Sequence, residues 1–495
     1  MAGIKALAKE TAIYGLSSIV GRFLNWCLVP LYVYIFKPAE YGIVSYLYSF
    51  TAVALVILNY GMETGFFRFA GKHEDSKRVY STSLMSVGMT SAAFILLISL
   101  FINPVSDALK LPAHPDYVWM LGVIVALDAF SNIPFAYLRF KKKAVRFASI
   151  KFLNVGLNIG LNLFFLLLCP WLDRHCPQSI GWFYHIPGGE SYGIGWIFVA
   201  NFITTLAVLI CLLPQLTGFR YIFDRTLLRQ MLRYSWPLLI LGVAGIMSQN
   251  MGQIIIPYLF PDDAEGARAM VGIYGANIKI AIVMVMFTQA FRYAYEPFIF
   301  ARDKARGEDK TRAYCDAMKF FVIFGLFIFL AVMYYLPVLK RFVSPAYWPG
   351  LDVVPIMMVA ERCMGIAFNL SLWYKLTDRT VWGMYLSVGC FLVMLALNLW
   401  LVPLIGIPGG YMGSAWAALV SYFLMMAVSL LAGRHYYPLP YQWKRMGLYA
   451  LLAGALWICG EYLLNFPAHM WLTYASRTIM LTAYLGIVIK CERRR

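Results

Sequence analysis

Residues 381–401 read VWGMYLSVGCFLVMLALNLWL, a run of 21 residues without one charged side chain. An α-helix rises 1.5 Å per residue, so about 20 apolar residues cross the hydrocarbon core of a bilayer. The run therefore predicts a membrane-spanning helix. It is one of many such runs in this chain.

The composition agrees with a membrane protein and excludes an ordinary soluble one. Hydrophobic residues make up 61% of the 495 residues and charged residues 13%, whereas soluble domains have about 45–50% and about 25%. We expect an all-α polytopic membrane protein with 14 spans, at 12–36, 41–62, 81–103, 117–138, 149–170, 191–214, 234–259, 271–298, 317–339, 351–373, 381–401, 411–432, 447–465 and 471–490.

The basic residues predict the orientation of the spans. The segments on the N-terminal side of the membrane hold 29 Lys and Arg, and the opposite loops hold 6. Cytoplasmic loops carry such an excess, so both termini are expected in the cytoplasm. The net charge of +18 is explained by this pattern, and nucleic acid is not an expected partner.

Short matches in the same order indicate an internal repeat. Tyr41-Gly42-Ile43-Val44 opens span 2, and Val271-Gly272-Ile273-Tyr274 opens span 8. Gly193-Ile-Gly-Trp196 enters span 6, and Gly413-Ser-Ala-Trp416 enters span 12. Spans 1–6 therefore appear again as spans 7–12 with the same orientation, as in transporters built from parallel repeats. We expect lobes at 1–233 and 234–446, followed by two further helices and a basic tail at 447–495.

The chain also resembles a known family. The residues that carry the resemblance are Val29-Pro-Leu-Tyr32, Pro38-Ala-Glu-Tyr-Gly42, Asn59-Tyr-Gly-Met-Glu63, Arg68, Tyr234-Ser-Trp-Pro237, Val271-Gly-Ile-Tyr274, Glu296-Pro297-Phe298, Asn398-Leu-Trp-Leu-Val-Pro403 and Gly406-Ile-Pro-Gly-Gly410. They are similar to the polysaccharide-biosynthesis (O-antigen or oligosaccharide-unit) flippases of the multidrug/oligosaccharidyl-lipid/polysaccharide (MOP) superfamily. These loose motifs extend over nearly the whole chain.

The resemblance implies two six-helix lobes around a central cavity and alternating access. It implies that a polyprenyl-diphosphate-linked sugar, as in lipopolysaccharide synthesis, moves from the inner to the outer leaflet of the bacterial inner membrane. In the lipid II branch two extra helices form a groove for the lipid tail, and in the drug-efflux branch the same core expels cations. The chain lacks a close match to the lipid II motifs, which favours the oligosaccharide-unit branch.

The first candidate substrate site lies in span 1. Arg22 is near the midplane, with Asn25 and Trp26 on the same face. An arginine offers a diphosphate both a fixed cation and planar donors, and the aromatic ring could stack on a sugar. The alternative is that Arg22 pairs with a buried carboxylate.

Span 8 carries a second candidate. Gln289, Arg292 and Glu296 form one polar stripe, and Lys279 lies on a different face. The resemblance implies that cavity arginines on spans 1 and 8 bind the substrate; otherwise Arg292 snorkels to the interface. Asn158 in span 5 belongs to an asparagine stripe that either holds helices together or forms a wall facing the sugar.

Acidic residues within the spans are candidates for ion coupling or gating, because a charge at membrane depth usually faces a cavity or a partner. They are Glu63, Asp128, Glu361 and Glu296, and the expected ion is H⁺ or Na⁺. Glu461 and Arg477 lie at similar depth in adjacent spans. We expect these two to form a structural ion pair.

The sequence offers no catalytic constellation. It contains no H-E-x-x-H, no Walker A sequence and no G-x-S-x-G. The acidic turn Asp262-Asp263-Ala-Glu265 is the only support for a membrane glycan-transferring enzyme, and a solvated turn explains it. We expect a transporter without cofactor or metal that acts as a monomer among membrane lipids, with polysaccharide assembly proteins as candidate partners. A cation-coupled multidrug exporter of the same superfamily is the alternative.

Overall fold

The computed structural model describes residues 20–21, 23–24, 26–73, 75–176, 184, 192–217, 219–303, 308–377, 379, 381–463 and 470–493. For 293–303, 308–310, 462–463 and 470 only the backbone is described. The described residues form helices, turns and loops and contain no strand. The all-α polytopic fold expected from the composition is confirmed.

Twelve helices of the described part are long and apolar enough to cross a membrane. They correspond to the expected spans 2–12 and 14. Expected span 13 is divided between a helix at Trp443–Ile458 and a π-helical turn at Cys459–Leu463. Most of expected span 1 lies outside the described residues.

The chain forms two compact units, Met1–Gly272 and Ile273–Arg495. The division falls within α13, because α12 packs against α3, α4 and α5 of unit 1. The repeat-based boundary at 233/234 stays a prediction.

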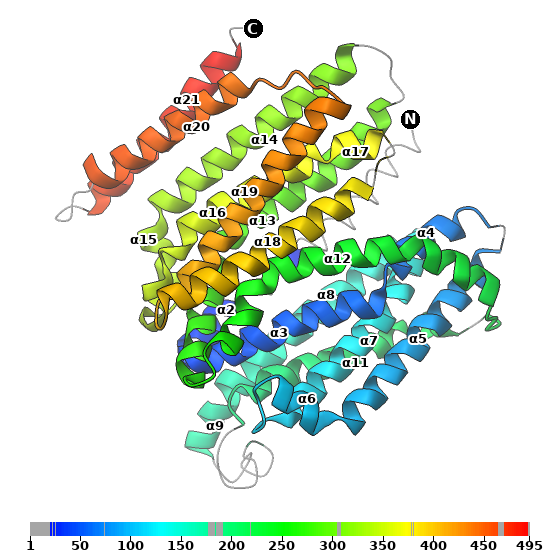
Figure 1. Ribbon diagram of the computed structural model, residues 1–495. Coiled ribbons are helices and arrows are strands. Elements are labelled where there is room, and N and C mark those ends of the chain that lie inside the picture. The colour runs from blue at the N-terminus through cyan, green and yellow to red at the C-terminus, as the bar shows by residue number, and fades with distance from the viewer. Residues whose placement is uncertain are drawn as a thin grey trace. The chain divides into compact units, whose positions relative to one another are not determined.

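Unit 1 is a bundle whose long helices α3, α5, α7, α8 and α11 lie side by side (Figure 1). Its core includes Met62, Phe66, Tyr80 and Ile133, all fully buried. The helices are α2 (Leu28–Ile35), α3 (Pro38–Asn59), α4 (Met62–Ala70), α5 (Ser76–Leu100), α6 (Ile102–Ala108), α7 (Pro115–Phe140), α8 (Ala144–Leu163), α9 (Cys169–His175), α11 (Gly195–Leu216), α12 (Arg225–Leu259) and the start of α13 (Ala264–Asp303).

Local chemistry explains where these helices begin and end. Pro38 occupies the first turn of α3, where its missing N–H costs nothing. Tyr60 and Gly61 adopt positive φ, which ends α3 before α4 starts. Asp224 caps α12, since its carboxylate accepts hydrogen bonds from the amides of Thr226 and Leu227. The Leu227 amide and the nearby Arg78 hold the pKa of this carboxyl below its usual range.

Two repeat-related glycines meet where α3 crosses the first turns of α13. An ideal Cβ on Gly42 would lie 1.9 Å from the carbonyl oxygen of Arg268, and one on Gly272 would lie 1.9 Å from that of Pro38. Real Cβ atoms never approach backbone so closely. The two backbones therefore touch only because both positions lack a side chain.

Unit 2 contains the rest of α13 and a second set of helices. Within it α16, α18 and α19 lie side by side, and α20 and α21 form a pair beside α14 (Figure 1). The helices are α14 (Glu308–Tyr334), α15 (Leu336–Leu339), α16 (Val353–Leu370), α17 (Leu372–Leu376), α18 (Val381–Ile405), α19 (Tyr411–Tyr436), α20 (Trp443–Ile458) and α21 (Met470–Arg493).

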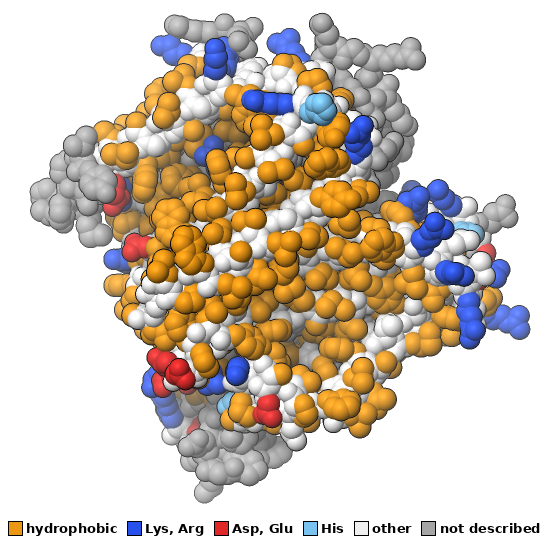
Figure 2. Space-filling model, viewed as in Figure 1, with side chains coloured by type: hydrophobic (Ala, Val, Ile, Leu, Met, Phe, Trp, Pro, Cys, Tyr) orange, Lys and Arg blue, Asp and Glu red, His pale blue; other side chains and the backbone are white. Residues whose placement is uncertain are grey.

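The visible surface matches a protein embedded in lipid. Figure 2 shows hydrophobic side chains over the long helices, with Lys and Arg gathered at the helix ends. In unit 1 the basic side chains gather at the end that holds α4 and the start of α5. A soluble protein would interleave charges along the helices, so the surface supports a multi-pass membrane protein.

Candidate functional site

Asp128 lies in the polar interior of unit 1. Its carboxylate on α7 accepts a hydrogen bond from the hydroxyl of Thr205 on α11, at 3.4 Å. Lys151 on α8 is the cation whose charge acts on it, and the Lys151 Nζ also lies 4.1 Å from the centroid of the Phe135 ring. One carboxylate, one amine and one hydroxyl from three helices thus meet inside the bundle.

A second polar group joins α7 to α3 and α4. The Asn132 side-chain amide donates to the side-chain oxygen of Asn59 at 3.1 Å. Further along, Arg139 forms an ion pair with Glu63, and its guanidinium lies 5.0 Å from the Phe67 ring centroid. Glu63 therefore has a cationic partner at the α4 end of unit 1, which is the arrangement of a gate or of a structural pair.

Asn158 belongs to a network between α8 and α2. The Asn162 amide donates to the Asn158 side-chain oxygen at 2.7 Å, and Asn162 accepts from the Tyr32 hydroxyl at 2.9 Å. The Tyr32–Asn162 bond ties α2 to α8, while the Asn162–Asn158 bond lies within α8. The first bond favours an interhelical role for the asparagine stripe. A role of Asn158 toward a sugar stays a prediction.

In unit 2, Arg292 and a neighbouring lysine flank one aromatic ring. The Arg292 guanidinium lies 4.1 Å from the Phe368 ring centroid, and the Lys375 ammonium lies 4.6 Å from the same centroid. Arg292 on α13 is exposed, and Lys375 on α17 is half-buried. Two cations therefore converge on Phe368 from different helices, and each gains a cation–π contact.

Glu361 lies on α16 in the interior of unit 2. Its charge acts on Tyr274 of α13 and Tyr422 of α19, and both tyrosines are buried. Lys279 and Gln289 lie half-buried on α13. A carboxyl whose charge reaches two buried tyrosines can take up a proton or a cation, which is what a coupling site requires.

The structure pairs Glu461 with Arg477. The Arg477 guanidinium donates to the Glu461 carboxylate at 2.9 Å, to the Tyr334 carbonyl at 2.9 Å and to the Gly460 carbonyl at 3.4 Å. Arg477 is only 1% exposed. The pair fastens α21 to the π-helical turn after α20 and to the end of α14.

Three of the sequence-based candidates lie outside the described residues: Arg22 and Asn25 entirely, and the side chain of Glu296. Trp26 is described and half-buried, and its ring lies 5.6 Å from that of Phe23. Among the described residues, no group of His, Cys, Asp and Glu could hold a metal ion.

Sequence reasoning missed the partners that complete these sites. Arg139 and Lys375 were used only as basic residues that indicate the orientation of the spans. Thr205 was not predicted to contact Asp128, because many spans carry a hydroxyl group. No spacing rule pointed to Lys375, because it lies seven residues after Phe368 and belongs to a separate helix, α17.

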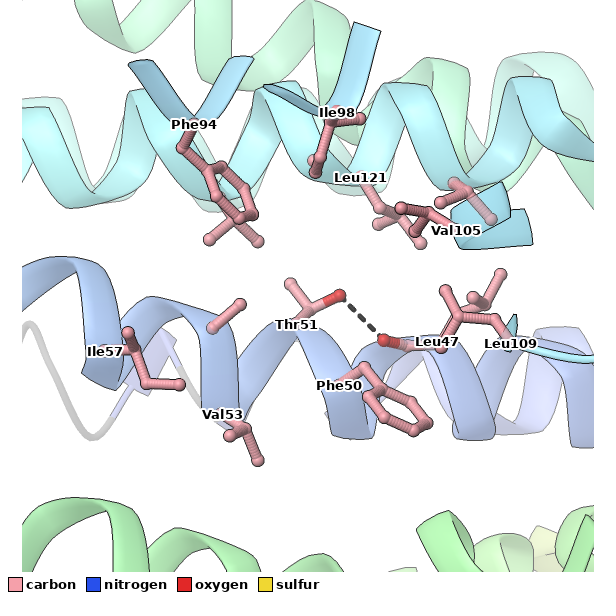
Figure 3. A pocket seen from close by; sticks show the side chains of 14 residues that line it. Leu47, Phe50, Thr51, Val53, Ile57, Phe94, Ile98, Val105, Leu109 and Leu121 are labelled. Atoms are coloured by element: carbon pink, nitrogen blue, oxygen red, sulfur yellow. Dashed lines mark hydrogen bonds between the residues drawn. The ribbon is translucent and has the colours of Figure 1, made fainter. Parts of the chain in front are cut away.

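Unit 1 also contains a groove between α3, α5, α6 and α7 that holds about 330 Å³ (Figure 3). Leu47, Phe50, Phe94 and Leu121 are among its walls, and the one hydroxyl there, on Thr51, donates to the carbonyl oxygen of Leu47. The groove can accept hydrocarbon. It offers nothing that would orient a sugar or a diphosphate.

A comparison with protein families identifies the family to which the chain belongs. The family model described as "Polysaccharide biosynthesis protein" matches residues 7–293, which is more than half of the chain. No curated protein matches the chain.

Solved structures share the fold. An inward-facing multidrug resistance MATE family transporter of the MOP superfamily is 15% identical, with a TM-score of 0.66 over 84% of this chain and 94% of that one. The lipid II flippase MurJ in an inward closed conformation is 12% identical, with a TM-score of 0.64 over 99% of this chain and 100% of that one. The chain therefore belongs to the polysaccharide biosynthesis protein family, and its multi-pass membrane fold is that of the MATE and MurJ structures.

Proposed function

We propose that this transporter moves a polyprenyl-diphosphate-linked oligosaccharide from the cytoplasmic to the outer leaflet of the bacterial inner membrane by alternating access. The observation that carries the proposal is the pair of cations on Phe368. Arg292 and Lys375 place two positive charges within 5 Å of one ring centroid. A diphosphate needs charge-assisted donors, and the guanidinium and the ammonium supply them.

The family supports this substrate class. Polysaccharide synthesis uses lipid-linked sugar units, and the MurJ structure with the same fold is described as a lipid II flippase. Both termini are proposed to lie in the cytoplasm because of the Lys and Arg distribution. An inside-negative membrane potential contributes about 2.3 kcal/mol per charge per 100 mV and favours outward movement of an anionic diphosphate.

The Arg292→Gln, Lys375→Gln double variant tests the proposal. We expect it to lower the rate of flipping at least about tenfold, because both cations near the diphosphate are lost. The purified full chain is reconstituted in liposomes with a fluorescent polyprenyl-diphosphate disaccharide, and the exposed label is quenched from outside. Lys340→Gln, Arg341→Gln removes the same charge from another basic pair and should flip normally. Equal rates for the two variants would contradict a role for the cations on Phe368.

Ion coupling is proposed to use Asp128 in unit 1 and Glu361 in unit 2. Each carboxyl lies inside its helix bundle beside hydroxyl groups, where it exchanges a proton or Na⁺ between states. We expect Asp128→Asn and Glu361→Gln to make flipping insensitive to imposed H⁺ and Na⁺ gradients. The measurement is the same liposome assay with each gradient set in turn at constant membrane potential. Wild-type flipping that ignores both gradients would overturn coupling and leave the flippase proposal standing.

A cation-coupled multidrug exporter is the second candidate. The fold of a multidrug resistance transporter and the interior acids Asp128 and Glu361 favour it. Accumulation of a cationic dye in cells with and without the chain separates the two functions. Lower dye accumulation that depends on Glu361, with no flipping of lipid-linked sugar in liposomes, would replace the flippase proposal.

A further inference from the structure

The groove between α3, α5, α6 and α7 of unit 1 is about as long as one leaflet of a bilayer is thick. Leu47 and Ile57 of α3 both line it. Ten helical residues rise about 15 Å, which is half of the roughly 30 Å hydrocarbon core. In Figure 3, Leu109 lies beside Leu47 at one end of the groove, and Phe94 lies opposite Ile57 at the other. One acyl chain of a membrane lipid has this reach.

The groove has an apolar floor and one open side. Leu47, Leu121 and Val125 line it and are buried, whereas Ile57 is 50% exposed. No charged side chain lines the groove, and its one hydroxyl, on Thr51, is bonded within α3. A polar ligand would lose its hydrogen bonds to water there without replacement. The groove therefore favours a hydrocarbon chain that enters from the side.

The end of the groove at Leu109 is fixed by two other helices, and we call this end the mouth. Lys110 follows Leu109 directly and adopts a φ of 57°. The Arg268 guanidinium on α13 donates to the Lys110 carbonyl oxygen at 2.9 Å, and the Tyr258 hydroxyl on α12 donates to the Ala108 carbonyl oxygen at 3.0 Å. These bonds hold the turn after α6 in place and bring a guanidinium next to the mouth.

The mouth carries charges of both signs. Lys110 is exposed and Arg268 is half-buried, and neither forms an ion pair within the described part of the chain. An arginine has five N–H donors, so Arg268 can donate to a phosphate as well as to the Lys110 carbonyl. Asp107 and Glu265 are exposed and lie three residues before Lys110 and Arg268. A headgroup that contains a phosphate and an ammonium would find a partner for each charge.

We propose that this groove binds one zwitterionic phospholipid of the outer leaflet, with an acyl chain along α3 and the headgroup at the mouth. The phosphate accepts from Lys110 and Arg268, and the ammonium donates to Asp107. In the orientation proposed above, the connection between α5 and α7 lies on the outer side, which places the mouth at the outer surface. A polyprenyl chain is methyl-branched and much longer than an acyl chain, and it does not fit a groove of about 330 Å³.

Photo-crosslinking locates the lipid without any transport substrate. The full chain is reconstituted in nanodiscs with a phosphatidylethanolamine that carries a diazirine at the end of one acyl chain, and mass spectrometry maps the adducts after illumination. We expect adducts near Ile57 and Phe94, at the end opposite the mouth, several-fold above those at Leu448 and Leu451, which are 62% and 74% exposed on α20. Adducts spread evenly over all exposed apolar positions would overturn the proposal, because the lipid would then act only as solvent.

A variant that fills the groove tests the place of the acyl chain. Figure 3 shows Thr51 midway along the groove, and Thr51→Phe should remove most adducts near Ile57 and Phe94. Thr482→Phe is the matched control, since Thr482 is exposed on α21 and its hydroxyl is also bonded within its own helix. It should leave the adducts unchanged. Equal adduct yields in the two variants would contradict binding in the groove.

A second pair of variants tests the headgroup. Native mass spectrometry with added phosphatidylethanolamine gives the Kd, which Lys110→Gln, Arg268→Gln should raise at least about tenfold, because two charge-assisted bonds are lost. Lys340→Gln, Arg341→Gln removes the same charge elsewhere and should keep the wild-type Kd. Equal Kd values for the two double variants would overturn the proposal, as would binding of phosphatidylglycerol or polyprenyl phosphate alone. None of these outcomes depends on whether the chain flips a lipid-linked sugar.

Discussion

Gly42→Ala is expected to lose nearly all transport and to unfold at a markedly lower temperature than the wild type. The added Cβ would lie 1.9 Å from the carbonyl oxygen of Arg268 and 2.8 Å from its carbonyl carbon. Both are backbone atoms, so no rotamer change relieves the clash and α3 must move away from α13. Overpacking of this kind costs about 1–3 kcal/mol or more, and Gly272→Ala should have the same effect because its Cβ meets Pro38.

The measurements are the Tm of the purified variants and their flipping rate in liposomes, where we expect a fall of at least about tenfold. Gly156→Ala and Gly160→Ala in α8 are the matched controls, since an ideal Cβ at either position has no neighbour within 4 Å. Alanine favours a helix over glycine by about 1 kcal/mol, so these controls should be as stable as the wild type or more so. A Gly42→Ala variant with the Tm and flipping rate of the controls would contradict this prediction. It would show that α3 and α13 can move apart without loss of stability or transport.

A double variant sharpens this result. Gly42→Ala, Gly272→Ala should cost less than the sum of the single changes, because one separation of the two helices relieves both clashes. Strict additivity would mean that the two glycines act in different places.

The sequence predicted the equivalence of these glycines but not their contact. Tyr41-Gly-Ile-Val and Val271-Gly-Ile-Tyr matched as repeat positions, and a repeat states which residues correspond without stating a distance. Only the backbone paths show that the two corresponding positions touch. The span positions were easier to predict, because an apolar run of about 20 residues in a membrane protein usually forms a helix that crosses the bilayer.

Predictions of polar partners depended on sequence separation. Glu461 and Arg477 belong to consecutive helices joined by a short connection, so similar depth sufficed to suggest their contact, which the structure shows at 2.9 Å. Glu63 and Arg139 are separated by two intervening helices, and the sequence did not indicate that they pair.

Arg477→Met is expected to lower the free energy of unfolding by about 3 kcal/mol, because it leaves the acceptors of a fully buried guanidinium without their donor. Arg477 is 1% exposed and donates to three groups, two of which are the carbonyl oxygens of Tyr334 and Gly460. Methionine fills a similar volume but donates to none of them. The loss should separate α21 from the end of α14, and reversible unfolding in mixed micelles measures it.

Glu461→Gln should cost much less, because the Glu461 side chain is 40% exposed and a glutamine oxygen still accepts from the guanidinium. The two changes together should cost less than their sum, since both remove the same Arg477–Glu461 contact. If Glu461→Gln instead destabilised the chain as strongly as Arg477→Met, the charge of the pair would hold α21 in place. If Glu461→Gln cost little stability, the bonds from Arg477 to the two backbone carbonyls would hold α21 in place. Any donor that reaches these carbonyls can satisfy them. Arg477→Lys would then retain much of the stability that Arg477→Met loses.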